Sequence, residues 1–162
     1  MKVWIPYILL FNLLIPNCEF GNPHWSDCFD PTFYEFSATL TAAEVYIDGE
    51  LKTTGQLAAF SGDEIRGLDS DGTSFFPPAG TNIWEVSLYS NQSSGTTVSF
   101  KYYDDVSDTV IDLNETITFA AGDIIGDAFV PFNFTGSGGG DTCDDVDADG
   151  VCDDVDDCVG EF

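Results

Sequence analysis

Basic residues are the scarcest feature of this 162-residue sequence, which holds four lysines and arginines against 29 aspartates and glutamates. The resulting formal net charge of −25 repels phosphate backbones and anionic membrane surfaces, so nucleic acid is excluded as a partner. The same charge attracts cations. The single histidine, His24, lies in an irregular stretch, which disfavours a Ser-His-Asp catalytic triad. Glycosidase chemistry needs two opposed carboxylates across a cleft, and the sequence does not indicate such a pair. We therefore expect no enzymatic activity.

Long hydrophobic runs are also missing. The apolar run Val3–Ile15 is too short to span a bilayer, so no membrane span is predicted. Because Lys2 precedes it, residues 1–21 are interpreted as a secretory signal peptide. Two alternatives remain open, namely a lipid anchor at Cys18 and a retained apolar N-terminus that packs against a neighbouring subunit. We expect the protein to be secreted, either extracellular or at the cell surface.

The middle of the chain carries a β pattern. Apolar residues make up 43% of the sequence and aromatic residues 14%, too many for a disordered chain. Apolar residues at every second position predict the buried face of a strand, for example the face formed by Trp84, Val86 and Leu88. The phase of the alternation shifts at Ala42-Ala43, which predicts a β-bulge. The dipeptides Asp48-Gly49 and Gly62-Asp63 predict hairpin turns.

About eight or nine short strands, with turns between them and no helical pattern, predict an all-β fold. We expect an antiparallel β-sandwich, Ig-like or jelly-roll-like, with a short irregular calcium-binding C-terminal segment. The predicted organisation is a signal peptide (1–21), an N-terminal segment (22–35), a β-sandwich (36–135), a Gly-rich linker (136–140) and a calcium-binding repeat (141–162).

Aspartates alternate near the C-terminus in a spacing that suits Ca²⁺. A 12-residue calcium loop supplies oxygen ligands from positions 1, 3, 5, 7, 9 and 12, with glycine at position 6. Gly150 occupies the turn position, and Asp156 stands where the loop usually has a glutamate. The predicted ligands are Asp145, Asp147, Asp149, the carbonyl of Val151, Asp153 and Asp156.

The register of residues 145–158 resembles the thrombospondin type 3 repeat, a calcium-binding, disulfide-tied element of secreted proteins. The stretches Leu57–Gly67 and Val98–Asp104 resemble a β-sandwich module that recurs in large secreted multidomain proteins. These resemblances imply a structural or adhesive extracellular setting. They also imply bonds between cysteines of successive repeats, which makes Cys143–Cys158 a candidate pair.

Five cysteines in an exported chain suggest disulfides. The candidates are Cys18, Cys28, Cys143, Cys152 and Cys158. A bond between Cys18 and Cys28 would close a small N-terminal loop, and we favour it over a zinc site that includes His24.

Two sets of residues are candidates for contact with glycans, as attachment sites or as binding residues. The sequons at Asn91, Asn114 and Asn133 predict N-glycosylation in a eukaryotic source. Three tyrosines at the outward parity of their strands, Tyr46, Tyr89 and Tyr103, are candidates for stacking on sugars. The ordinary alternative is that they are exposed surface tyrosines. The sole arginine, Arg66, is expected in a cross-strand ion pair.

The sequence thus predicts a calcium-stabilised, non-enzymatic structural or adhesive protein. We expect its partners to be further copies of itself or other extracellular proteins. One form of the hypothesis is a fibril built by strand donation from residues 22–35. The alternative function is a carbohydrate-binding module of a larger secreted protein.

Overall fold

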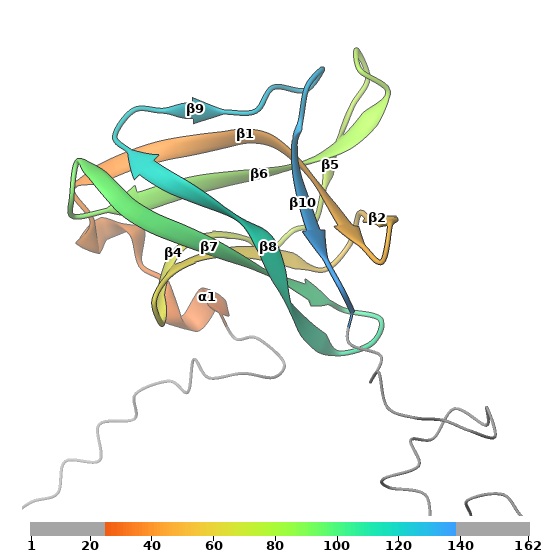
Figure 1. Ribbon diagram of the computed structural model, residues 1–162, viewed down its shortest axis with the longest axis horizontal. Coiled ribbons are helices and arrows are strands. Elements are labelled where there is room, and N and C mark those ends of the chain that lie inside the picture. Colours follow the sequence, from red (N-terminus) through yellow and green to blue (C-terminus); the bar gives the residue numbers. More distant parts are fainter. Residues whose placement is uncertain (1–24, 139–162) are drawn as a thin grey trace, which may run out of the picture.

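The computed structural model describes residues 25–138, and most of these lie in strands (Figure 1). Two short helices come first, α1 (Trp25–Cys28) and the 3-10 helix η1 (Pro31–Phe33). The strands are β1 (Phe36–Ile47), β2 (Glu50–Lys52), β3 (Gln56–Ser61), β4 (Glu64–Asp69), β5 (Ser74–Phe76), β6 (Thr81–Ser90), β7 (Ser94–Asp104), β8 (Thr109–Ala120), β9 (Ile124–Ile125) and β10 (Phe132–Gly136). The predicted all-β class is confirmed for this part of the chain.

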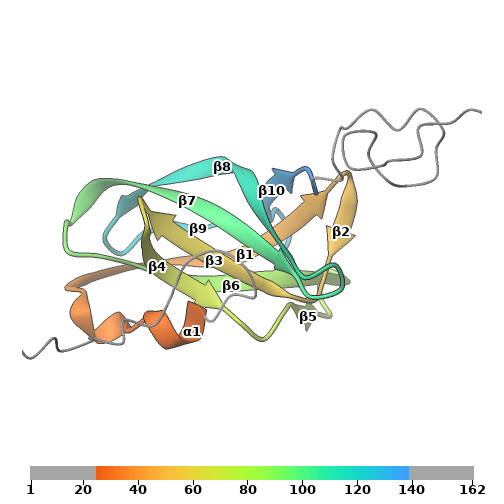
Figure 2. The same ribbon diagram turned by 90° about the horizontal axis from the view of Figure 1, so that it is seen from below.

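All ten strands belong to one hydrogen-bonded sheet with the order β4-β3-β7-β8-β10-β1-β6-β5, to which β2 and β9 add through β1. The sheet curls until β4 lies against β6 (Figure 2). Gly67 permits this approach, because a Cβ there would lie 2.5 Å from the Ser87 carbonyl oxygen. Beside it, the Asp69 carboxylate accepts a hydrogen bond from the Glu85 backbone N–H at 3.3 Å. β4, at one end of the sheet, therefore packs against β6, the next-to-last strand of the order.

The expectation of purely antiparallel pairing is wrong at β1. This strand pairs in parallel with β10, where Ala43 aligns with Phe132 and Ile47 with Gly136, and also in parallel with β9. The other pairs, including β1–β6 and β7–β8, are antiparallel. Local turn signals report only hairpins, so a pairing between the first and last long segments leaves no mark in the sequence.

The core fills the inside of the curl. Its largest fully buried side chains include Trp84, Tyr102, Phe100, Phe119, Phe134, Leu40 and Leu57. Phe100 of β7 and Phe134 of β10 have ring centroids 4.4 Å apart, and Trp84 of β6 meets Tyr102 edge-on at 6.0 Å. Trp84, Val86 and Leu88 are all buried, which confirms the predicted face on β6, because period-two alternation places every second side chain on one side of a strand.

The predicted bulge and hairpins are present. The register of β1 against β6 shifts between Leu40 and Ala43, and Ala42 and Ala43 are both fully buried. Asp48 (φ 52°) and Gly49 (φ 82°) form the turn between β1 and β2, as a two-residue hairpin with left-handed central residues requires. Residues 109–120 form one continuous strand, β8.

The segment before β1 packs against its own domain. Trp25 of α1 is only 3% exposed and meets Phe60 of β3 edge-on, with ring centroids 5.8 Å apart. Phe29 and Cys28 border the same small cluster, which also contains Ile65 of β4. α1 thus covers the outer face of β3 and β4 (Figure 2).

Candidate functional site

The predicted calcium ligands belong to the C-terminal segment, residues 141–162. Asp145, Asp147, Asp149, Val151, Asp153 and Asp156 all lie outside the described residues. Between residues 25 and 138, no group of three or more His, Cys, Asp or Glu side chains is placed to hold a metal ion. The calcium segment therefore stays a prediction from its spacing.

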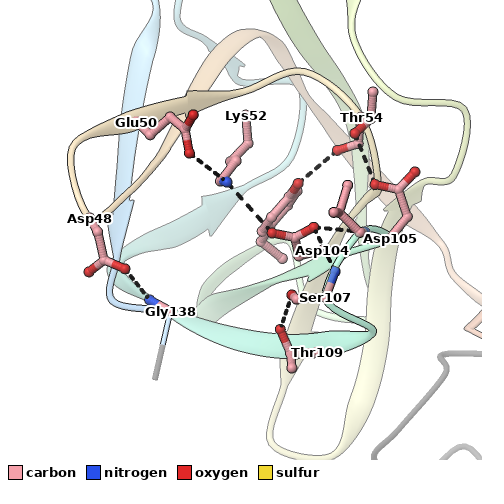
Figure 3. Close-up of polar contacts among 11 residues, drawn as sticks. Asp48, Glu50, Lys52, Thr54, Asp104, Asp105, Ser107, Thr109 and Gly138 are labelled. Atoms are coloured by element: carbon pink, nitrogen blue, oxygen red, sulfur yellow. Dashed lines mark hydrogen bonds and ion pairs between the residues drawn. The ribbon is translucent and has the colours of Figure 1, made fainter. Parts of the chain in front are cut away.

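An acidic hollow of about 400 Å³ opens where the described chain ends (Figure 3). Its walls come from the β1–β2 hairpin, from the turn between β7 and β8, and from the residue that follows β10 by two positions. It is lined by Ile47, Asp48, Glu50, Lys52, Asp104, Ser107, Thr109, Ile111 and Gly138.

Lys52 joins two carboxylates across this acidic hollow. Its Nζ lies 2.9 Å from Glu50 Oε2 and 3.6 Å from Asp104 Oδ2. The hydrogen bond to Glu50 raises the pKa of Lys52, so the ammonium stays charged. Because Glu50 lies in β2 and Asp104 at the end of β7, this one cation links segments that are far apart in the sequence.

Asp104 also caps the turn that follows it. Its Oδ1 accepts hydrogen bonds from the backbone N–H groups of Val106 at 2.9 Å and Ser107 at 3.4 Å. Burial alone would raise the pKa of the Asp104 carboxyl, but these hydrogen bonds and Lys52 outweigh it and hold the pKa below its ordinary value. The carboxylate is therefore fixed in its charged form.

Asp48 forms two hydrogen bonds with residues at and just after the end of β10. Its Oδ2 accepts the Gly138 N–H at 3.1 Å, and its own backbone N–H donates to the Gly136 carbonyl at 3.0 Å. The charged groups of the acidic hollow thus bond to one another and to the backbone. These contacts hold Gly136 and Gly138 against the β1–β2 hairpin.

A second hollow, of about 330 Å³, lies between η1 and the β3–β4 hairpin; we call it the aromatic hollow. It is lined by Cys28, Asp30, Phe33, Tyr34, Asp63, Glu64, Ile65 and Asn91. The Tyr34 hydroxyl donates to the Ile65 carbonyl at 2.9 Å, and burial raises the pKa of Tyr34. The Arg66 guanidinium lies 4.9 Å from the centre of the Tyr34 ring.

The predicted ion pair of Arg66 exists, but it is not cross-strand. Its Nη2 lies 2.6 Å from Oε2 of Glu64, two residues earlier on β4. Alternate residues of a strand share a face, so such a pair needs no second strand. The Arg66 Nε is buried without a hydrogen-bond partner.

The three candidate tyrosines have separate surroundings, and each is half-buried. Tyr46 donates its hydroxyl to Glu44 Oε2 at 2.7 Å. Tyr89 packs against Phe29 and Tyr34 at ring-centroid distances of 5.8 and 6.1 Å, beside the aromatic hollow. Tyr103 borders the cluster under α1 and donates to Asp108 at 2.8 Å. The structure does not bring the three together into one platform.

The three sequon asparagines are all exposed. Asn91 follows β6, and its side-chain oxygen accepts the Glu35 N–H at 3.0 Å. Asn114 and Asn133 lie within β8 and β10 rather than at strand ends, and Asn114 Nδ2 donates to Thr135 Oγ1 at 3.0 Å.

Cys28 is disulfide-bonded. Its predicted partner, Cys18, lies outside the described residues, as do Cys143, Cys152 and Cys158.

Sequence reasoning missed the contact of Lys52 with Asp104 and the contact of Glu115 with Thr135, in which the carboxylate accepts both the backbone N–H and the hydroxyl at 2.7 Å. The one available signal for Lys52 is that cations are rare in this chain. Glu115 has no such signal, because its partner lies on a strand whose pairing is not local.

Neither helix in residues 25–138 is long or apolar enough to cross a membrane. Comparison of the chain with protein-family models, with curated proteins and with solved structures finds no match.

Proposed function

We propose that this protein is a secreted, non-enzymatic structural or adhesive module, in which a β-sandwich is joined by a short linker to a calcium-rigidified segment. What carries the proposal is the order of the parts. The curled sheet ends at Gly136, Asp48 holds Gly138, and the aspartate register begins at Asp145 after a glycine-rich stretch. A folded domain therefore directly precedes a segment whose carboxylates repel one another until a cation joins them.

The sandwich assignment is supported by how the core is built. Residues of β6 and β7, which are separated in the sheet order, meet at the Trp84–Tyr102 contact, and β7 meets β10 at Phe100–Phe134. Two facing halves of a curled sheet that share one apolar core have the layer arrangement of a sandwich.

The calcium segment is expected to act as a stiff spacer. With Ca²⁺ bound, the clustered carboxylates are neutralised; without it, like charges keep the segment extended. Extracellular modules bind calcium with Kd of about 10⁻⁴–10⁻³ M, which suits a structural role rather than signalling.

Calorimetry of the whole chain with millimolar CaCl₂ tests this proposal. We expect binding heat that is lost in Asp147→Asn/Asp149→Asn. The matched control, Asp71→Asn/Asp123→Asn, removes the same charge from the surface of the β-domain and should retain the heat. If the wild-type chain gives no heat, or if both double variants lose it equally, the calcium role is wrong.

Assembly by donating residues 22–35 as a strand is part of the sequence hypothesis, and α1 bears on it. Within that segment Trp25 is buried against Phe60 of its own domain. Donation would require α1 to unwind and Trp25 to leave this cluster. We therefore retain self-association in the proposal and look for its contact surface elsewhere in the sheet.

Carbohydrate binding is the second candidate function, and the aromatic hollow favours it. Phe33 is 75% exposed at its rim, next to polar groups from Asp30, Asp63 and Asn91. An exposed ring beside carboxylate and amide groups suits a sugar, which has an apolar face and hydroxyl edges. A glycan array tests it: binding that is lost in Phe33→Ala but kept in Phe75→Ala supports this function, and no binding by the wild-type chain removes it.

A further inference from the structure

β8 has a partner strand on only one side for much of its length. It pairs with β7 from Thr109 to Ala120, but it meets β10 at a single position, where Gly136 aligns with Leu113. Beyond that point β8 and β10 diverge (Figure 1). Among the strands of residues 25–138, none pairs with the other side of Thr116–Ala120, which we call the β8 edge.

A side chain bridges β8 and β10 where their backbone ladder ends. The Glu115 carboxylate accepts the backbone N–H and the hydroxyl of Thr135, both at 2.7 Å. The Thr135 N–H points toward β8, yet it bonds to a side chain and not to a backbone carbonyl of that strand. The ladder between β8 and β10 therefore stops at this point, and the β8 edge is left beyond it.

The β8 edge lacks the charges and prolines that usually protect an exposed strand. Its sequence, Thr-Ile-Thr-Phe-Ala, has no charge, proline or glycine, although the chain has 29 acidic residues. Ile117 and Phe119 point into the core, and Thr116 and Thr118 are exposed. Soluble proteins ordinarily guard such edges with charges, proline or very short strands.

Other strands at the margins of the sheet are short, with three residues in β2 and two in β9. β4 is covered by β6 at the close approach of Gly67 to Ser87. β5 is only three residues long and is followed by Pro77-Pro78. The contrast singles out the β8 edge as a surface for strand pairing.

We propose that the β8 edge is a self-association surface that pairs antiparallel with the β8 edge of a second copy of this chain. This inference rests on the assembly part of the proposed function and names its contact. Two-fold pairing would continue the order β4-β3-β7-β8 into the β8 of the second copy, and would set uncharged threonine and alanine opposite one another. Although the chain is strongly acidic, this pairing joins two copies at a stretch where no carboxylate faces another.

The test compares two lysine substitutions in the full chain, produced without N-glycans because Asn114 lies next to the edge. Thr118→Lys places a charge on the β8 edge. Thr97→Lys is the matched control, because Thr97 is the exposed partner of Thr118 on β7, one strand further in. Sedimentation velocity between micromolar and millimolar concentrations should show a wild-type dimer, weakened at least tenfold by Thr118→Lys and unchanged by Thr97→Lys.

Hydrogen exchange of the wild-type chain gives a second readout that needs no variant. Backbone amides within residues 116–120 should gain protection as the concentration rises. A wild-type chain that stays monomeric overturns the proposal, as does a dimer equally sensitive to both substitutions or one with unchanged exchange at the β8 edge. If the amides of residues 116–120 gain protection only when a different protein is added, the proposal is also overturned. Calcium calorimetry is independent of these outcomes, so failure here would leave the calcium proposal standing.

Discussion

Thr135 donates both its backbone N–H and its hydroxyl to the carboxylate of Glu115, each at 2.7 Å. Through this contact β8 and β10 remain joined after their backbone ladder has ended at Leu113. Hydrogen bonds to a charged acceptor are stronger than those between neutral groups. The contact therefore stands in for part of a missing ladder.

Replacing Glu115 should measure that contribution. We expect Glu115→Ala to lower the free energy of unfolding by about 1–2 kcal/mol, because two hydrogen bonds to a charged acceptor are lost. The exposed Glu85, whose side chain makes no comparable contact with the backbone, provides the control Glu85→Ala. Urea denaturation reports both, and equal losses would show that the contact contributes nothing specific.

Two glycines with the same backbone angle separate conformational strain from steric exclusion. Gly55 and Gly95 both have φ of 89°, but a Cβ at Gly55 would lie 2.1 Å from the Tyr103 carbonyl oxygen, whereas nothing lies within 4 Å at Gly95. Gly95→Ala should cost about 1–2 kcal/mol from strain alone. Gly55→Ala should cost clearly more, or prevent folding. Thermal unfolding compares them, and similar melting temperatures would contradict the tight packing at Gly55.

The Asp104 carboxylate should make stability depend on pH. Its pKa is lower in the folded chain than in the unfolded chain, so its contribution is present above about pH 4 and is lost as the pH falls through the folded pKa. Asp104→Asn should therefore lower stability by about 1 kcal/mol at pH 7, with the difference from wild type shrinking at pH 3. Asp123→Asn, at an exposed position, is the control. Urea unfolding at both pH values checks this, and a difference that grows on acidification would reverse the sign of our argument.

Removing the anchor of α1 tests whether residues 25–35 belong to the folded domain. Trp25→Ala should lower the free energy of unfolding by about 3 kcal/mol, because a buried aromatic ring is lost from its contact with Phe60. Phe33→Ala, at a ring that is 75% exposed, should change it little. Chemical denaturation distinguishes the two. A Trp25→Ala variant as stable as wild type would free this segment for donation to a neighbour.

Much of the strand architecture could be predicted from local patterns. The face of Trp84, Val86 and Leu88 follows from alternation, and the bulge at Ala42-Ala43 follows from a shift in its phase. The turn at Asp48-Gly49 follows from residues that tolerate positive φ. Each of these signals lies within a few residues of the structure it specifies.

The features that local patterns do not predict depend on contacts between residues far apart in the sequence. The parallel pairing of β1 with β10 joins segments near the two ends of the domain. α1 is too short to form on propensity and is stabilised by the burial of Trp25. The acidic hollow depends on Lys52 and Asp104, which only the folded sheet brings within 3.6 Å. The predicted calcium ligands stay a prediction, since they lie outside the described residues.

The parallel ladder between β1 and β10 also has a mechanical consequence. β1 is the first long strand and β10 the last, and both run in the same direction. Tension applied to the two ends of the sheet drags these strands lengthwise past each other, which loads the rungs from Ala43 to Ile47 in shear and all at once. Breaking several backbone hydrogen bonds at the same time takes more force than breaking them one after another, so a series of such domains would resist stretching.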